Sequence, residues 1–270
     1  MQYIGSIIGD YCGSIYEWNN FKGENPNNVE ILKTGKFTDD SILTIAVMDW
    51  LNKTQGENKG ENKDELIKII KEWVHKNPDA GYGGRFHKWA FGDSVNPINS
   101  FGNGSAMRVA PCAYFANTIE ECLDLAKKSA EVTHNHEEGI KGAQAIAESI
   151  YLARCGAGKS DIKMVIEKEY GYNLDLNLNT IGTKSHPFDA TCQVTVPESI
   201  ICFLNSDNFL DCIRKSIYIG GDSDTIAAIS AGIAEAYYGI PSFVEEMIKD
   251  KFPNDIKNVI IEFNKTMLER

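Results

Sequence analysis

Two short acidic clusters carry residue types that could hold metal ions. The first is Thr38-Asp39-Asp40-Ser41, and the second is Gly220-Gly221-Asp222-Ser223-Asp224-Thr225. Each cluster pairs two carboxylates with hydroxyl residues and runs directly into an apolar segment of helical pattern. Hard divalent cations such as Mg²⁺ and Mn²⁺ prefer oxygen ligands of this kind. If the fold brings the clusters together, their four carboxylates can hold two such ions, although Asp40 and Asp222 are 182 positions apart.

Both clusters also have a structural interpretation. Thr38 or Asp39 can cap the helix that follows, where a carboxylate also complements the helix dipole. One carboxylate is enough for a cap, however, and two adjacent carboxylates repel each other unless a positive charge lies beside them. The spacing of the two aspartates in the second cluster is also found in calcium-binding EF-hand loops. That interpretation fails, because Ala227 and Ile233 occupy the positions where such a loop needs Gly and Glu.

Three further segments carry side chains that could complete a site. Glu17 ends an apolar, glycine-containing segment, where a solvated helix-end residue is the alternative. The loop Phe101-Gly102-Asn103-Gly104-Ser105-Ala106-Met107 opens a helix, so its backbone N–H groups could bind an anion or phosphate, although Gly-Asn-Gly is also ordinary turn chemistry. His134 could bind substrate or metal, whereas we expect His136 at the surface.

Helical periodicity dominates the chain and predicts an all-α fold. Apolar side chains recur at helix-face spacing over residues 41–52, 118–132, 139–155, 225–238 and 254–268. Thr118 is the expected N-cap of the second of these helices. Alternating strand patterns are nearly absent, and the best candidate for a strand is the short segment 191–196.

Three other segments have less regular patterns. Residues 52–65 contain a duplicated GENK and no apolar side chain between the flanking helices, which predicts a solvated surface loop. Residues 171–187 are also expected to be irregular. The aromatic and basic segment 81–89 lines the mouth of a cleft or, alternatively, forms a surface turn with Trp89 packed inward.

Composition narrows the class of protein. The chain has 270 residues, is 43% hydrophobic and carries a net charge of −11, which makes nucleic acid or an anionic membrane an improbable main partner. Its seven cysteines form no zinc-type pair, so we expect free, mostly buried thiols. The first ten residues have neither the basic start nor the long apolar stretch of a signal peptide, so we expect none there, and no run reaches the length of a membrane span. These features predict a cytoplasmic protein.

Five motifs, in this order, resemble those of the ADP-ribosylglycohydrolase family, which includes the dinitrogenase-reductase-activating glycohydrolases. They are GDYCGSIYE, TDDS, FGNGSAMRVAP, THNHEEGIKGA and GGDSDTIAAISAGIAEAYYG. The resemblance covers residues 4 to about 241. One departure is Ser223, where many members carry Thr between the two aspartates.

The resemblance implies a compact single-domain orthogonal helical bundle over residues 1–270, with two Mg²⁺ or Mn²⁺ ions in a central cleft. It implies the metal ligands Thr38, Asp39, Asp40, Asp222, Asp224 and Thr225. It implies that the substrate contacts Phe101, Gly102, Asn103, Gly104, Ser105, Ala106, Met107 and His134. It places catalysis on Glu17, Asp39 and Asp222, with Glu17 as the candidate acid/base or gating residue.

The expected activity is metal-dependent hydrolysis of the N- or O-glycosidic bond that joins ADP-ribose to a modified side chain or related conjugate, with ADP-ribose as product. Cleavage at the anomeric carbon of a ribose passes through an oxocarbenium-like state, which paired carboxylates and metal ions can stabilise. Two alternatives stay open. One is a dinuclear-metal nucleotide phosphohydrolase, and the other is a non-catalytic ADP-ribose-binding protein on the same scaffold. The linkage, the target and the oligomeric state are not readable, and a monomer is the default.

Overall fold

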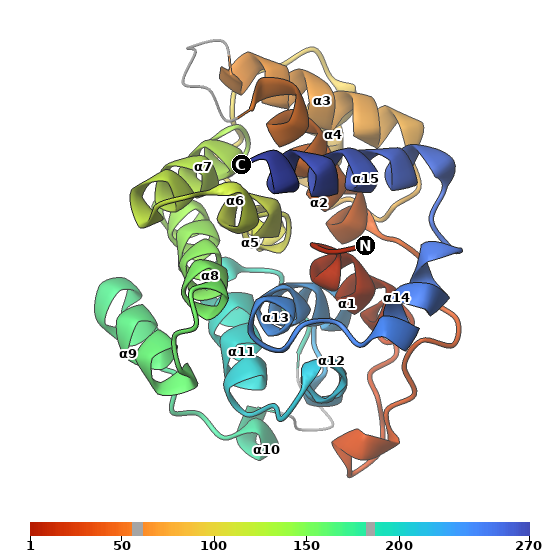
Figure 1. Ribbon diagram of the computed structural model, residues 1–270, viewed down its shortest axis with the longest axis vertical. Coiled ribbons are helices and arrows are strands. Elements are labelled where there is room, and N and C mark those ends of the chain that lie inside the picture. Colours follow the sequence, from red (N-terminus) through yellow and green to blue (C-terminus); the bar gives the residue numbers. More distant parts are fainter. Residues whose placement is uncertain (56–61, 182–186) are drawn as a thin grey trace.

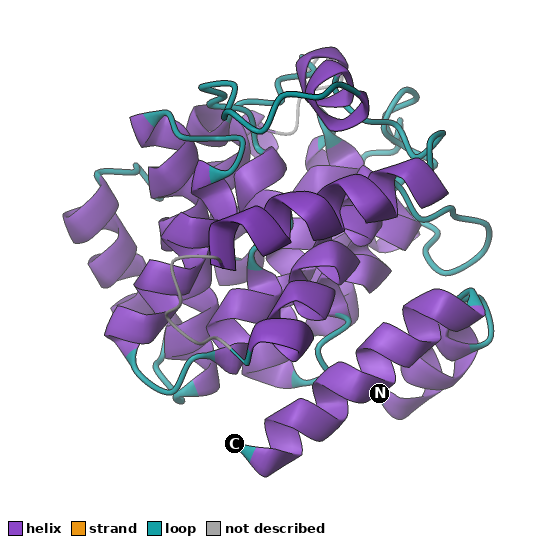
Figure 2. Ribbon diagram, turned by 90° about the horizontal axis from the view of Figure 1, so that it is seen from above, coloured by secondary structure: helices purple, strands orange, loops and turns teal. Residues whose placement is uncertain are grey.

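A computed structural model describes residues 1–55, 62–181 and 187–270. Within these ranges helices form all of the regular structure, as fifteen α-helices and one 3-10 helix at Pro26–Asn28. The expected all-α fold is confirmed, and Figures 1 and 2 show the helices packed into one body. No helix of the described residues is long and apolar enough to cross a membrane.

Two central helices organise the molecule, α1 (Gly5–Gly13) and α13 (Ser223–Tyr238) (Figure 1). Every residue of α1 is buried, and α13 is buried from Ser223 to Glu235. Helices that are apolar or small on all sides are expected in the interior, surrounded by other helices. Those in contact with this pair include α2 (Asp39–Thr54), α5 (Gly104–Met107), α6 (Ala110–Phe115), α8 (Glu137–Arg154), α11 (Cys192–Leu204) and α12 (Phe209–Ile219).

The remaining helices cover this centre from outside (Figure 1). They are α3 (Asn62–Lys76), α4 (Gly84–Phe91), α7 (Ile119–Glu131), α9 (Lys159–Tyr170), α10 (Leu178–Ile181), α14 (Ser242–Lys249) and α15 (Asn254–Glu269). Helix α15 packs across α2, and α7 packs against α8.

Glycines allow the backbones of α1 and α13 to touch. Gly5, Gly9 and Gly13 recur every four residues and therefore lie on one face of α1. A Cβ atom on Gly9 would lie 2.1 Å from the carbonyl oxygen of Ala227, and one on Gly13 would lie 2.5 Å from the Cα of Asp224. No side chain fits there, so the glycine face sets the closest approach of the two helices.

All five helices expected from periodicity are confirmed, with ends shifted by one or two residues. They correspond to α2, α7, α8, α13 and α15. The hydroxyl of Thr118 accepts from the backbone N–H of Glu121 at 3.2 Å, as expected for the N-cap of α7. Thr38 caps α2 by accepting from the N–H of Asp40.

The strand expected at residues 191–196 is wrong. Only Thr191 makes an isolated bridge, to Gly102, and the chain then enters α11 at Cys192. Alternating Val and Thr suit a strand, but propensity of this kind yields to burial. Here α11 packs against α8, α12 and α13, and among the described residues no strand exists with which it could pair.

The two expected loops are shorter than predicted. Helix α2 extends to Thr54 and α3 begins at Asn62, so both ends of the 52–65 segment are helical; residues 56–61 lie outside the described part. The segment 171–187 is irregular apart from the single turn α10, and 182–186 are likewise outside the described residues. All seven cysteines are free, and all but Cys155 are buried, as expected.

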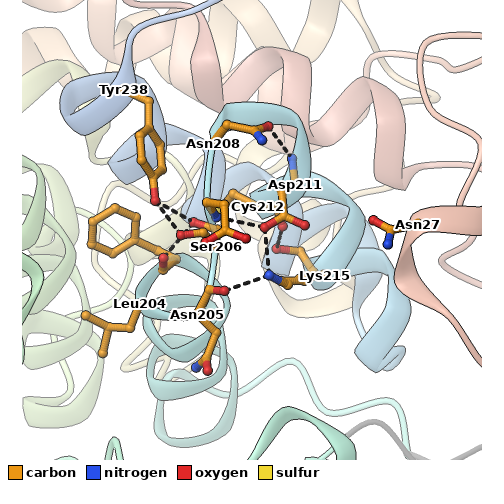
Figure 3. Close-up of polar contacts among 12 residues, drawn as sticks. Asn27, Leu204, Asn205, Ser206, Asn208, Asp211, Cys212, Lys215 and Tyr238 are labelled. Atoms are coloured by element: carbon orange, nitrogen blue, oxygen red, sulfur yellow. Dashed lines mark hydrogen bonds and ion pairs between the residues drawn. The ribbon is translucent and has the colours of Figure 1, made fainter.

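A polar network fastens α11, α12 and the end of α13 to one another (Figure 3). The hydroxyl of Tyr238 donates to the carbonyl of Ser206 at 2.5 Å, and Lys215 donates to the carbonyl of Asn205 at 2.6 Å. Lys215 also pairs with Asp211 at 2.6 Å. Cations that bind the last carbonyls of a helix stabilise its C-terminus. The network thereby fixes α13, whose other end carries Asp224.

Glu235 fastens the other end of the central pair. Its two carboxylate oxygens accept from the backbone N–H groups of Tyr3 and Gly5, each at 2.6 Å, and so serve as the cap that α1 otherwise lacks. Burial raises the pKa of Glu235 from 4.5 to about 7, although the backbone donors oppose this shift. The carboxylate therefore links the stability of the fold to pH.

We expect Gly9→Ala to lower the free energy of unfolding by about 2 kcal/mol or more, because its Cβ meets the backbone of α13. Gly84→Ala is the matched control, since no atom lies within 4 Å of the added Cβ. Denaturant unfolding of both variants measures the effect. Equal stability of the two variants would contradict the proposed role of the glycine face.

The pKa of Glu235 is higher in the folded chain than in the unfolded chain, so folding takes up a proton between these values and the free energy of unfolding falls as pH rises through them. Glu235→Gln removes this contribution. Relative to wild type, the variant should gain about 2 kcal/mol of stability between roughly pH 5.5 and pH 8. Denaturant unfolding across this range measures it, with exposed Glu246→Gln as control. A pH-independent difference would be the contrary result.

Candidate metal centre and cleft

One cleft collects most of the residues predicted from the sequence. It has a volume of about 510 Å³ and is lined by both acidic clusters, the glycine loop, His134 and the segment before α4. The lining residues whose side chains could bind a metal ion or a ligand are Glu17, Asp39, Asp40, Asn103, His134, Asp222, Asp224 and Thr225. A shallow hollow of about 630 Å³ on the outer face of α3 contains none of the predicted site residues.

Carboxylates from three parts of the chain meet in two groups. Asp10, Asp40 and Asp224 each place an oxygen within 4.8 Å of the others, and so do Glu17, Asp222 and Asp224. Asp224 belongs to both groups. Two neighbouring cation positions that share Asp224 would fit this arrangement, and the two acidic clusters therefore do come together across the 182-residue gap.

Asp10 is the residue that sequence reasoning missed. It is fully buried on α1 and accepts from the N–H and the hydroxyl of Thr38, at 2.9 and 2.6 Å. It also accepts from the N–H of Ser41 at 3.1 Å and from the Ser41 hydroxyl. These bonds hold the start of α2 against α1. The sequence did contain a signal, a single acidic residue inside an otherwise apolar helical segment. Acidic residues are rarely buried without a partner, so this one indicated a buried polar contact.

Asp40 has an oxygen without a partner. Its Oδ2 accepts from the hydroxyl of Thr225 at 3.1 Å, which links the two acidic clusters directly. Its Oδ1 is buried, and no hydrogen bond among the described residues ends on it. An orphaned carboxylate oxygen inside a protein is costly unless a cation or proton satisfies it. A hard divalent cation fits an orphaned oxygen in a set of donors made only of oxygen atoms.

The acidic residues of the cleft have raised pKa values. Burial is the largest cause for each, followed for most of them by the charge of Asp224. The pKa of Glu17 rises to about 7 and that of Asp10 to about 7, while those of Asp39, Asp40 and Asp222 rise well above their usual range. So much repulsion at neutral pH calls for positive charge in the site.

Asp39 and Thr38 differ in position. Asp39 lines the cleft, is half-buried and donates its backbone N–H to Ala80 at 2.9 Å, but it belongs to neither carboxylate group. Thr38 is buried, and its hydroxyl donates to Asp10 behind the cleft wall. Of the six predicted metal ligands, Asp40, Asp222 and Asp224 therefore belong to the carboxylate groups and Thr225 contacts Asp40.

The glycine loop is fastened to the second cluster through Asn103. Its side-chain amide donates to Asp222 at 2.7 Å and to the hydroxyl of Thr195 at 3.1 Å. The backbone N–H of Asn103 donates to Ala190, and that of Gly102 to the hydroxyl of Ser100. These bonds leave Gly104 at the start of α5 on the cleft wall.

Three residues of the predicted loop do not line the cleft. Phe101 is exposed and packs edge-on against His136, with 5.3 Å between the ring centroids. Ser105 is buried, and its hydroxyl donates to the carbonyl of Gly139 at 2.7 Å. Ala106 is also buried outside the lining. Gly102, Asn103, Gly104, Met107 and His134 do line it.

The mouth of the cleft is built from aromatic and glycine-rich segments. Residues 81–86 line it, while Trp89 is buried on α4, so the segment combines the two roles considered from the sequence, with a helix from Gly84 in place of a turn. Two further lining residues are aromatic: Trp18 stacks on Phe188 with 5.1 Å between ring centroids. Both aromatic side chains are exposed and lie next to Glu17 in the lining.

Comparisons with known proteins agree with the motifs. The sequence model of the family described as ADP-ribosylglycohydrolase matches residues 3–267. The protein named ADP-ribosylhydrolase ARH3 from Mus musculus is 25% identical, over 89% of this chain and 84% of its own. ADP-ribosylarginine hydrolase Tri1 from Pseudomonas putida is 26% identical, over 91% of this chain and 72% of its own.

A solved structure described as an ADP-ribosylglycohydrolase-related protein complex shares the fold. It superposes with a TM-score of 0.65 at 20% sequence identity, over 98% of this chain and 94% of that one.

We expect Asp40→Asn to stabilise the cation-free protein near neutral pH while weakening its response to Mg²⁺ or Mn²⁺. The substitution removes one repelling charge, and a gain of about 1 kcal/mol corresponds to roughly 3 °C in Tm for a chain of this size. Wild type should gain stability from either cation, because a cation binds the carboxylates of the folded chain more tightly than those of the unfolded chain.

Thermal unfolding with EDTA and with each cation measures both effects. Asp93→Asn, at an exposed carboxylate outside the cleft, is the matched control. An Asp40→Asn variant that is less stable than wild type in EDTA, yet responds normally to cations, would contradict the assignment.

Proposed function

The chain belongs to the ADP-ribosylglycohydrolase family, and we propose that it is a metal-dependent hydrolase that cleaves the N- or O-glycosidic bond between ADP-ribose and a modified side chain or related conjugate. The coarser activity follows from the family and its relatives: the chain is a glycosidic-bond hydrolase of the kind that reverses ADP-ribosylation. We further propose that residues 1–270 make up a single ADP-ribosylglycohydrolase-like domain.

One observation carries the proposal: carboxylates of α1, α2, α13 and the segment after α1 converge at the cleft, next to the glycine loop, whose Asn103 donates to Asp222. Asp224 belongs to both carboxylate groups, and Asp40 has a buried oxygen without a hydrogen-bond partner among the described residues. Oxygen donors in such groups suit two Mg²⁺ or Mn²⁺ ions. When bound, these ions would lower the pKa of water and polarise the ribose hydroxyls.

The ligand set in the proposal consists of the acidic clusters together with Asp10. Asp40, Asp222 and Asp224 would hold the cations directly, and Asp39 and Thr225 lie beside them on the cleft wall. Thr38, which the resemblance also implies as a ligand, donates its hydroxyl hydrogen to Asp10 and accepts from the backbone N–H of Asp40. Asp10 orients the start of α2 in either case.

The part of the cleft formed by the glycine loop and His134 suits the ADP-ribose part of the substrate. Gly102, Gly104, Met107 and His134 line the cleft there, and the small glycines leave room for a ligand to approach the backbone. A diphosphate is well matched to backbone N–H groups and a ring N–H, which carry no competing negative charge. The volume of about 510 Å³ falls within the range of small-molecule sites.

Glu17 is the proposed acid/base. It is half-buried, lines the cleft and has a carboxylate oxygen within 4.8 Å of those of Asp222 and Asp224. A carboxylate in this position can take a proton from the attacking water or give one to the leaving group. Asp39 and Asp222, the other two proposed catalytic residues, line the same cleft.

We expect the wild-type protein to release ADP-ribose from ADP-ribosylated protein in the presence of Mg²⁺ or Mn²⁺ and to lose this activity in EDTA. Asp39→Ala and Asp222→Ala should reduce release severely. Glu17→Gln should lower kcat by about 100-fold or more with a small effect on KM, as is typical for loss of an acid/base group. Chromatography of the released nucleotide measures the rates.

Glu30→Gln is the matched control for Glu17→Gln, since Glu30 is exposed and outside the cleft. Undiminished release by Asp39→Ala or Asp222→Ala would contradict the mechanism. Orthophosphate or AMP among the products would identify a phosphohydrolase instead. Binding of ADP-ribose without turnover would identify a non-catalytic member. Substrates linked through arginine, serine and nucleic acid, compared side by side, would define the linkage.

A further inference from the structure

Arg108 is a buried cation without a carboxylate partner. It follows α5 directly, has no exposed surface, and forms no ion pair with any described residue. Its Nη2 donates to the carbonyl of Ser129 at 2.6 Å and to the hydroxyl of Thr133 at 2.9 Å, while Nε and Nη1 find no acceptor among the described residues. Burial lowers its pKa to about 10, so it stays charged at neutral pH. A charge buried at such cost calls for an explanation.

The Thr133 hydroxyl connects Arg108 to His134. Its oxygen lies 2.7 Å from Nδ1 of His134, and Thr133 is fully buried. Because a guanidinium can only donate, Thr133 must accept from Arg108 and has its own hydrogen free to donate. Among the described residues, the only acceptor bonded to this hydroxyl is Nδ1. If Nδ1 carried a proton instead, the buried hydroxyl hydrogen would lose its partner, which is unfavourable.

The other ring nitrogen faces the cleft. His134 lines the cleft, and a Cβ atom placed on Gly104 would lie 3.0 Å from its Nε2, while one on Gly102 would lie 3.7 Å away. No hydrogen bond of the described residues ends on Nε2. Burial, followed by the charges of Arg108 and Arg85, lowers the pKa of His134 well below its usual range. A neutral ring with its proton on Nε2 therefore points toward Gly104 and Gly102 of the cleft lining.

We infer that Arg108 is a positioning residue that, through Thr133, holds His134 as a neutral donor with its proton on Nε2, so that the ring donates to an oxygen of the bound ligand. The inference rests on the proposed function for the identity of that ligand, an oxygen of the ADP-ribose diphosphate or ribose. Arg108 itself touches no ligand. Its effect is to fix which nitrogen donates and which way the ring faces.

This arrangement has a consequence for recognition in an acidic site. In the other neutral tautomer the proton is on Nδ1. The unprotonated Nε2 would then present a lone pair to an anionic ligand and repel it. The Arg108–Thr133 pair excludes that tautomer. The charge of Arg108 lies on the far side of Thr133 from the ring, and the bonds of its guanidinium to described residues go to Ser129 and Thr133, not to a carboxylate of the acidic clusters.

The first test reads the ring directly. Long-range ¹H–¹⁵N correlation spectra of the five histidine rings, with His134→Ala as the assignment, report which nitrogen carries the proton. We expect wild-type His134 to show a protonated Nε2 and an unprotonated Nδ1 near neutral pH. Protonation on Nδ1, or on both nitrogens, would overturn the inference whether or not the protein binds ADP-ribose.

The second test measures binding. Thr133→Val removes the hydroxyl with little change in volume, and we expect it to weaken the affinity for ADP-ribose by about ten-fold, the effect of one misplaced hydrogen bond to a charged group. Thr266→Val, also at a buried threonine but on α15, is the matched control. In the His134→Ala background, Thr133→Val should cause no further loss, because the relay acts only through the ring. An additive loss, or wild-type affinity of Thr133→Val, would overturn the inference.

Arg108 is tested by two variants. Arg108→Met should give a mixture of ring tautomers and an affinity similar to that of Thr133→Val, and Arg108→Lys, which keeps a charged donor, should recover part of both. If Arg108→Met does not fold, Arg108→Lys and Thr133→Val decide the question. If every folded Arg108 variant has the ring spectra and the affinity of wild type, Arg108 does not position His134. Absence of ADP-ribose binding by wild type would instead refute the proposed function. The ring spectra would then still test whether Arg108 and Thr133 fix the tautomer of His134.

Discussion

The backbone contact between α1 and α13 is the constraint on which the rest of the structure depends. It exists because Gly5, Gly9 and Gly13 leave no side chain between the helices. The contact places Asp10 beside Asp224, and Asp10 then holds Thr38 and Ser41 at the start of α2. The position of the first acidic cluster thus follows from a packing distance, and the hydrogen bond from Thr225 to Asp40 closes the link to the second cluster.

This arrangement causes electrostatic repulsion among the buried carboxylates. Several buried carboxylates share one wall in a protein whose net charge is already negative, and each raises the pKa of its neighbours. A divalent cation would relieve this repulsion, and stability and the proposed activity would then depend on the same group of residues. In the proposed function, the wall formed by the glycine loop and His134 would meet an anionic ligand with backbone amides and a neutral ring, backed by a buried guanidinium, in place of exposed basic side chains.

Particular residues show where sequence reasoning reached its limit. The helices were readable because Leu, Ile, Val and Trp recur at helical spacing, which is a local property. The segment 191–196 was misread, since Val and Thr alternate there and only the burial of α11 among α8, α12 and α13 selects the helix. Asp10 was missed because its importance lies in contacts with residues about thirty positions later.

The sequence by itself determined the helical class, the two acidic clusters, the glycine loop and His134, because residue type and short-range spacing carry this information. Tertiary structure decided that Asp224 is shared between two carboxylate groups, that Thr38 faces Asp10, and that Phe101 lies outside the cleft. It also decided that Nδ1 of His134 meets the Thr133 hydroxyl, which accepts from the buried Arg108, while Nε2 lies beside Gly104. The physical reason is that these features depend on distances between residues far apart in the chain, and those distances are set by how closely the helices pack.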